Sequence, residues 1–190
     1  MNLLTLALSL KRMKRIELHG KKFKRFIDAK SIQNAIDDLA IQINRDYNGK
    51  RPVFIGVLNG SFLFTADVVR RFKSDCEVAF LRLASYDGTD STGKVNELVG
   101  LNEDLKDRDV LILEDIVDSG NTLAYLMENL STYQPNSLKV ATFLFKPNAY
   151  KKDFPVDYRG IEVGNEFLVG YGLDFDGLGR NLEDIYIIED

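Results

Sequence analysis

The chain has 190 residues, which is enough for one α/β domain with a substantial core. Apolar residues make up 45% of the sequence and charged residues 28%, a balance typical of a globular protein and not of a disordered one. The formal net charge of -4 argues against general attraction to nucleic acid or anionic lipid. A single cysteine, Cys76, excludes an intrachain disulfide and a cysteine-cluster zinc site, and a single histidine, His19, argues against a histidine zinc site. If a metal takes part, we expect a hard cation held by carboxylates and substrate phosphates, which points to Mg²⁺.

The amino-terminal segment is an apolar run, residues 1–10, followed by basic side chains. A secretory signal has its positive charges before the apolar stretch and a small-residue cleavage site after it, and neither feature is present. The run is also too short to span a bilayer. We therefore expect a cytoplasmic protein without a membrane partner. We further expect a dispensable extension at residues 1–12 and a single domain over residues 13–190, with Met13 as its start.

After an opening segment at residues 16–26, the first half of the chain predicts alternating helices and strands. Apolar side chains recur at helical spacing from Ile32 to Ile43, with Ser31 as the expected N-cap and Asn48-Gly49 as the stop. The compact apolar run Val53–Leu58 is typical of a strand buried on both faces. The next predicted segments are a helix over Phe62–Phe72, a strand over Val78–Leu83, a polar loop over Ser85–Gly93 and a short strand near Glu97–Leu101.

The second half contains the clearest strand–loop–helix unit of the chain. Val110–Leu113 predicts a strand, Glu114–Asn121 a loop and Thr122–Leu130 a helix. Leu138–Phe145 predicts another strand, which ends at Lys146-Pro147. Short apolar pieces follow at residues 160–163, 167–169 and 185–188. This alternation predicts an α/β fold with a mostly parallel sheet covered by helices.

Polar residues follow three of the predicted strands. These residues are Asn59-Gly60-Ser61, Glu114-Asp115 and Lys146. In a parallel sheet the ligand binds beyond the carboxyl ends of the strands, so we expect donors, carboxylates and a cation to meet at one edge. The sequence therefore predicts a binding site there.

The segment Glu114–Thr122 has the composition of a phosphate-binding turn. A strand-to-helix turn rich in small residues leaves backbone N–H groups aimed at one spot, and the helix dipole adds positive potential there. Gly120 permits close approach, and Ser119 and Thr122 supply hydroxyl donors. The bland alternative is an ordinary N-capped loop with solvated acids. Two apolar residues flanked by acids, then Ser-Gly-x-Thr, all directly after an aliphatic strand, favour the functional interpretation.

These residues resemble those of a known family. Val110–Leu123 resembles the phosphoribosyl-pyrophosphate-binding motif of type I phosphoribosyltransferases, and the likeness to the hypoxanthine (guanine) phosphoribosyltransferases runs from about Ile16 to the C-terminus. It includes Val57-Leu58-Asn59-Gly60-Ser61-Phe62, Ser85-Tyr86, Phe145-Lys146-Pro147, residues 167–174 and Arg180. The resemblance implies the type I phosphoribosyltransferase fold, in which helices flank a mostly parallel central sheet and the terminal segments form a small hood.

The resemblance also implies purine salvage. The 5-phosphoribosyl group would pass from phosphoribosyl pyrophosphate to N9 of hypoxanthine, and of guanine, to give IMP or GMP and pyrophosphate. The implied cofactor is Mg²⁺, and the implied ligands are phosphoribosyl pyrophosphate and a 6-oxopurine. Relatives are usually dimers or tetramers, so a homodimer or homotetramer is expected. No nucleic-acid partner is implied.

The residue roles carried over by the resemblance begin with the sugar diphosphate. Contacts to its 5′-phosphate and ribose are implied for Glu114, Asp115, Asp118, Ser119, Gly120, Asn121 and Thr122. Pyrophosphate contacts are implied for Leu58, Asn59, Gly60 and Arg180, and the Leu58–Asn59 peptide is often cis in this family. The implied metal ligands are Glu114, Asp115 and, for a second ion, Asp174.

The other implied roles concern the purine and a lid. Asp118 would lie near purine N7 and take its proton as the C–N bond forms, while Lys146 would donate to the 6-oxo group. Phe167 would stack on the base, and the backbone of Leu168 would contact its edge. Asp174 is also implied to bind the purine. The loop over residues 85–95, with Ser85 and Tyr86, resembles a mobile lid that excludes water.

Two departures from the family pattern and two alternatives remain. Asn59 stands where many relatives have a basic residue, and Asn148-Ala149-Tyr150 lacks a basic residue that some relatives have, so pyrophosphate affinity would depend more on Mg²⁺ and Arg180. Lys146 argues against adenine, because an ammonium cannot accept from an amino group, but xanthine stays open. A regulator that keeps this fold and binds nucleic acid is the alternative from another class, and it should show a basic face.

Overall fold

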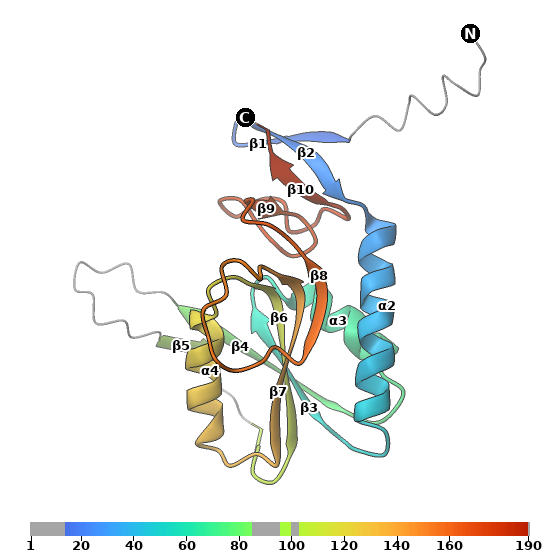
Figure 1. Cartoon of the computed structure of the whole chain (residues 1–190), viewed down its shortest axis with the longest axis vertical. Helices are drawn as coiled ribbons and strands as arrows, with labels where there is room; N and C mark the ends of the chain where they lie inside the picture. Colours follow the sequence, from blue (N-terminus) through green and yellow to red (C-terminus); the bar gives the residue numbers. More distant parts are fainter. Residues whose placement is uncertain (1–13, 85–95, 100–102, 190) are drawn as a thin grey trace. The chain divides into compact units, whose positions relative to one another are not determined.

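The computed structural model describes residues 14–84, 96–99 and 103–189 (Figure 1). The predicted extension at residues 1–12 and the predicted lid with Ser85 and Tyr86 lie outside the described residues. The chain divides into two compact units, one formed by Gln33–Asn165 and the other by the two terminal segments, up to Ile32 and from Glu166. Of the helices in the described ranges, none is long and apolar enough to cross a membrane.

The larger unit is built on a mostly parallel sheet. Its six strands lie in the order β5-β4-β3-β6-β7-β8, and only the edge strand β5 runs antiparallel to its neighbour. The strands are β3 (Val53–Leu58), β4 (Glu77–Ala84), β5 (Asn96–Val99), β6 (Asp109–Val117), β7 (Ser137–Phe145) and β8 (Tyr158–Glu162). The predicted α/β architecture is therefore confirmed, because the buried apolar runs of the sequence became the neighbouring strands β3, β6 and β7.

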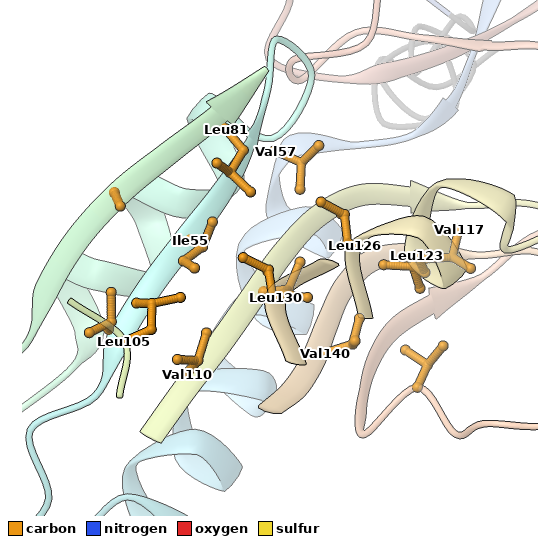
Figure 2. Close-up of a cluster of buried hydrophobic side chains, with 14 of the residues drawn as sticks. Ile55, Val57, Leu81, Leu105, Val110, Val117, Leu123, Leu126, Leu130 and Val140 are labelled. Carbon is orange, nitrogen blue, oxygen red and sulfur yellow. The ribbon is translucent and has the colours of Figure 1, made fainter. Parts of the chain in front are cut away.

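Helices cover both faces of this sheet. They are α2 (Ala29–Asp46), α3 (Phe62–Arg71) and α4 (Asn121–Ser131). Figure 2 shows Leu123 and Leu126 of α4 beside strand residues such as Ile55, all of them in one buried cluster. Since successive side chains of a strand point to opposite faces, the neighbouring Phe54 packs on the other side. There its ring meets the ring of Phe72, at the end of α3, with centroids 5.0 Å apart.

Strand β6 is longer than the sequence indicated. The sequence predicted a loop from Glu114 to Asn121, but β6 continues to Val117 because it stays paired with β7 up to Phe145. The run of apolar residues ends at Glu114 and Asp115, whereas the backbone pairing with β7 continues beyond them. Glu114 and Asp115 consequently lie within the strand, and the turn before α4 consists of residues 118–120 alone.

The start of α2 also differs from the prediction. Ser31 is not the N-cap, since the helix already begins at Ala29. The carboxylate of Asp28 accepts a hydrogen bond of 2.8 Å from the backbone N–H of Ser31, which is the contact that an N-cap residue makes with the third helical residue. Asp28 is therefore the cap. The predicted stop is confirmed, because α2 ends at Asp46 and Gly49 adopts a left-handed conformation with φ of 74°.

The smaller unit joins the two terminal segments in an antiparallel sheet, as the implied hood requires. Its strands lie in the order β1-β2-β10-β9 and are β1 (Arg15–Leu18), β2 (Lys21–Ile27), β9 (Leu168–Val169) and β10 (Ile185–Ile188). A small core of Phe23, Val169 and Tyr186 holds the sheet together. The buried Asp184 accepts a hydrogen bond of 2.8 Å from the N–H of Ala29.

Candidate active site

The turn between β6 and α4 encloses a small cavity. It has a volume of about 90 Å³ and is lined by Glu114, Ile116, Val117, Asp118, Ser119, Gly120, Asn121, Thr122 and Leu123. Gly120 is the N-cap residue of α4, with φ of 83°, and no side chain caps the helix. The first N–H groups of a helix have no partner within the helix, and its dipole favours an anion there. The segment predicted to bind phosphate is thus an uncapped helix start that opens into a cavity.

Two carboxylates stand on β6 just before this turn. Glu114 is 7% exposed, and within the described part of the chain its Oε2 atom has no hydrogen-bond partner. Burial, together with the negative charge of Asp115, raises the pKa of Glu114 well above its ordinary value. An unsatisfied buried carboxylate oxygen beside a second carboxylate fits a hard cation such as Mg²⁺.

The loop after β3 approaches the same carboxylates. The Leu58–Asn59 peptide is cis, as the family pattern led us to expect. Gly60 lies so close to Asp115 that a Cβ atom at this position would overlap its carboxylate. The predicted convergence of β3 and β6 at one edge of the sheet is therefore confirmed, and it is closer than sequence spacing could indicate.

The third strand of this edge brings an ion pair to the turn. Lys146, directly after β7, places its Nζ atom 3.1 Å from Oδ2 of Asp118. The Lys146 side chain is 11% exposed and that of Asp118 is 57% exposed. The pair presents an accessible acceptor next to a fixed donor. This combination suits a heterocycle that offers an N–H group near a carbonyl oxygen.

The remaining predicted site residues lie in the smaller unit. The ring of Phe167 is 47% exposed and packs edge-on against Phe175, with centroids 5.7 Å apart. Asp174 accepts from the N–H of Gly177 at 2.7 Å and pairs with Nη2 of Arg180 at 2.7 Å. Leu168 is buried in β9. The structure thus joins Asp174 to Arg180 directly, a contact that the sequence did not predict.

Sequence reasoning also missed the contacts of the segment after Lys146. Tyr150 was noted only because it belongs to a stretch without a basic residue, yet its ring lies against Gly120 in the turn. The N–H of Lys151 donates to the carbonyl oxygen of Ser119 at 3.3 Å. No periodicity or motif in the sequence marks these contacts, because they depend on how two loops fold together.

Comparison with known proteins decides the family. Residues 25–176 match the family model described as the phosphoribosyl transferase domain. The chain belongs to the phosphoribosyltransferase family. This phosphoribosyltransferase is 38% identical over 176 residues to the hypoxanthine-guanine phosphoribosyltransferase of Aquifex aeolicus, an alignment that covers 92% of this chain and 99% of that protein.

Solved structures agree with this assignment. A hypoxanthine-guanine phosphoribosyltransferase of Bacillus anthracis superposes with a TM-score of 0.81 at 37% identity, covering 87% of this phosphoribosyltransferase and 96% of that chain. The hypoxanthine phosphoribosyltransferase of Trypanosoma cruzi gives a TM-score of 0.83 at 34% identity, with coverage of 92% and 95%. The predicted family and fold are confirmed, and the alternative of a nucleic-acid-binding regulator finds no support among these relatives.

Proposed function

We propose that this phosphoribosyltransferase serves purine salvage and transfers the 5-phosphoribosyl group of phosphoribosyl pyrophosphate to N9 of hypoxanthine or guanine. The bond from the anomeric carbon to pyrophosphate breaks, the bond to N9 forms, and the products are pyrophosphate and IMP or GMP. The observation that supports this proposal best is the pair of Asp118 and Lys146 beside an uncapped helix start. A 6-oxopurine offers the N–H and the carbonyl that this pair matches, and the helix start suits a phosphate.

On the sugar side, we assign the 5′-phosphate to Ser119, Gly120, Asn121 and Thr122. Their backbone N–H groups and hydroxyls would replace the water around an anion without having to reorganise. Glu114 and Asp115 would accept hydrogen bonds from the ribose hydroxyls. Holding the sugar in this way aligns the anomeric carbon with the incoming base, and alignment is the main contribution that a protein makes to such a displacement.

On the base side, we assign Asp118 as the catalytic base and Lys146 as the donor to the 6-oxo group. As the bond to N9 forms, positive charge develops on the purine, and Asp118 takes the proton from N7. The exposed ring of Phe167 would stack on the base, and the backbone of Leu168 would read its edge. Guanine and hypoxanthine share the 6-oxo group, so both fit this set.

The pyrophosphate and the metal complete the assignment. Mg²⁺, when bound, neutralises charge on the departing pyrophosphate. Glu114 and Asp115 would hold one ion. Asp174 would hold a second ion and would also belong to the purine site. Leu58, Asn59 and Gly60 would contact the pyrophosphate through their backbone. Arg180 would contribute its guanidinium, for which it must leave Asp174, its partner in this structure.

We also propose that the enzyme is cytoplasmic and forms a homodimer or homotetramer. The description of the Trypanosoma cruzi relative concerns its oligomeric state and the role of its C-terminal region in it. Size-exclusion chromatography with light scattering tests this point, and a monomer at all concentrations contradicts it.

The reaction is tested by a spectrophotometric assay with phosphoribosyl pyrophosphate, Mg²⁺ and each of hypoxanthine, guanine, xanthine and adenine. We expect turnover of hypoxanthine and guanine, with kcat reduced by about 10²–10⁴-fold in Asp118→Asn. Asp38→Asn, at an exposed position of α2, serves as the matched control and should retain wild-type activity. Turnover of xanthine or adenine alone contradicts the proposed substrate. No turnover by folded protein that still binds phosphoribosyl pyrophosphate contradicts the proposed reaction.

A further inference from the structure

The segment that follows β7 contacts every residue of the turn between β6 and α4. The N–H of Lys146 donates to the carbonyl oxygen of Val117 at 2.9 Å, and its Nζ pairs with Asp118. The N–H of Lys151 donates to the carbonyl oxygen of Ser119 at 3.3 Å. We call residues 146–152 the bracing segment, because its backbone N–H groups bind the carbonyl oxygens of Val117, just before the turn, and Ser119, within it.

Gly120 is held by side chains of the same segment. A Cβ atom at Gly120 would stand 2.6 Å from Cε2 of Tyr150 and 2.8 Å from Cγ of Lys152. Carbon atoms in contact are about 3.5–4.0 Å apart, so the ring and the lysine stem leave no space above this glycine. Gly120, in its left-handed conformation, is consequently covered on one side by the ring of Tyr150.

Tyr150 is itself fixed from several directions. Its hydroxyl donates to the carbonyl oxygen of Phe154 at 2.7 Å, and its N–H donates to the carbonyl oxygen of Lys146 at 3.1 Å. Its ring centroid lies 5.4 Å from that of Phe145 and 6.1 Å from that of Phe154, within the range of favourable aromatic pairs. The ring therefore has a defined place, joined to the main core cluster of the larger unit.

The bracing segment determines where the amides of the turn point. In a trans peptide the carbonyl and the N–H point in opposite directions. The carbonyls of Val117 and Ser119 point at the bracing segment, so the N–H groups of Asp118 and Gly120 point away from it. Residues 118 and 120 line the cavity at the start of α4. The hydrogen bonds of the bracing segment therefore fix the orientation of the peptide units that carry these two N–H groups.

We propose that Tyr150 is a positioning residue of the phosphate site. Its ring presses on Gly120 and keeps the amides of the turn aimed at the 5′-phosphate, without touching the substrate. This inference rests on the proposed role of the turn. It also gives a role to Tyr150 within the stretch Asn148-Ala149-Tyr150, for which the sequence alone indicated none.

The test compares two ligands, IMP and inosine, which differ only in the 5′-phosphate. Their dissociation constants are measured by calorimetry. The dissociation constant of inosine divided by that of IMP reports the contribution of the phosphate. We expect this ratio to fall by about 10- to 100-fold in Tyr150→Leu, because a misplaced site loses affinity on that scale. Tyr150→Met, which keeps a longer apolar side chain, is measured alongside it and should show the same loss. Tyr150→Phe keeps the ring and should retain the wild-type ratio.

Two controls separate positioning from stability and from the proposed function. Leu138→Ala removes another side chain packed on the same core cluster, so it should lower the melting temperature and leave the ratio unchanged. Thr122→Asp places a negative charge in the first turn of α4, which suits the helix dipole but repels a phosphate, and the ratio should collapse. If Thr122→Asp lowers the ratio and the folded Tyr150 variants do not, Tyr150 has no positioning role. If Thr122→Asp leaves the ratio unchanged, the phosphate binds elsewhere, and the proposed site and this inference both fail.

Discussion

At the scale of single residues, a buried and a partly buried carboxylate on β6, Glu114 and Asp109, show how neighbouring groups set the pKa of an acid. Burial alone raises the pKa of a carboxyl group, and this effect prevails at Glu114, where the described residues offer no donor to Oε2. Burial acts on Asp109 as well, yet the side chains of Ser137, Asn136 and Lys50 donate to it and lower its pKa from 3.8. Among the described residues, Glu114 thus keeps an unsatisfied carboxylate oxygen, whereas Asp109 is satisfied by protein side chains.

The network at Asp109 predicts a pH-dependent contribution to stability. A carboxyl group with a lowered pKa in the folded state stabilises the protein above its unfolded pKa, and this stabilisation is lost as the pH falls through the folded pKa. We expect Asp109→Ala to lower the free energy of unfolding by about 1–3 kcal/mol near neutral pH, since hydrogen bonds to a charge are removed. The deficit should shrink in strong acid. Urea unfolding at a series of pH values measures it, and a deficit that is independent of pH refutes this interpretation.

A second residue-scale prediction concerns Gly60. In Gly60→Ala the new methyl group would overlap the Asp115 carboxylate and displace it, so we expect kcat/KM for phosphoribosyl pyrophosphate to fall by about tenfold or more. Gly49→Ala is the control, since its Cβ would meet no atom within 4 Å. The control should cost some stability, because φ is positive there, and leave kcat/KM unchanged. Equal kinetic effects of the two changes would show that Asp115 is not the cause.

At the scale of elements, the start of α2 gives a direct test of the cap. We expect Asp28→Ala to lower the free energy of unfolding by about 0.5–2 kcal/mol, the usual cost of a lost N-cap. Ser31→Ala should have little effect, because only its backbone N–H takes part in the cap. Chemical unfolding of the two variants under one condition distinguishes them, and the reverse order of stability would restore Ser31 as the cap.

The predicted and observed strands show which parts of the fold could be predicted from the sequence and which could not. The strands β3, β6 and β7 were predictable because short segments rich in apolar residues have few other places in an α/β fold. The meeting of the candidate site residues at one edge of the sheet was predictable as well, since parallel strands carry their polar ends to the same edge. The extension of β6 through Glu114 was not, because pairing with β7 continues where hydrophobicity stops.

Contacts between loops were beyond prediction for a different reason. The overlap of Gly60 with Asp115, the ring of Tyr150 over Gly120 and the pairing of Asp174 with Arg180 each join residues that no helical or strand period relates. Family resemblance implied roles for several of these residues. It did not indicate which side chain supports which, because that information lies in the packing of this chain.

At the scale of the whole molecule, the extension expected at residues 1–12 can be tested by comparing two truncations. Removal of residues 1–12 should leave kcat and the melting temperature unchanged, because the first strand in the described part of the chain starts at Arg15. Removal of residues 1–18 also deletes β1 and the pairing of Arg15 with Glu189, and the apolar Ile16 and Leu18 no longer pack on the core of the smaller unit. We expect a clear fall in melting temperature for the second truncation alone. Equal melting temperatures would show that β1 adds nothing to stability.

The antiparallel sheet of the smaller unit also has a consequence for synthesis on the ribosome. Strand β2 pairs with β10, and the backbone of Glu189 donates to Lys22, so this sheet needs the end of the chain. The unit of residues 33–165 is continuous and can form while later residues are still being added. Phe167, Asp174 and Arg180 belong to the smaller unit, whose sheet needs the end of the chain. A nascent chain that is released after residue 165 therefore has the turn before α4 together with Asp118 and Lys146, but it lacks Phe167, Asp174 and Arg180.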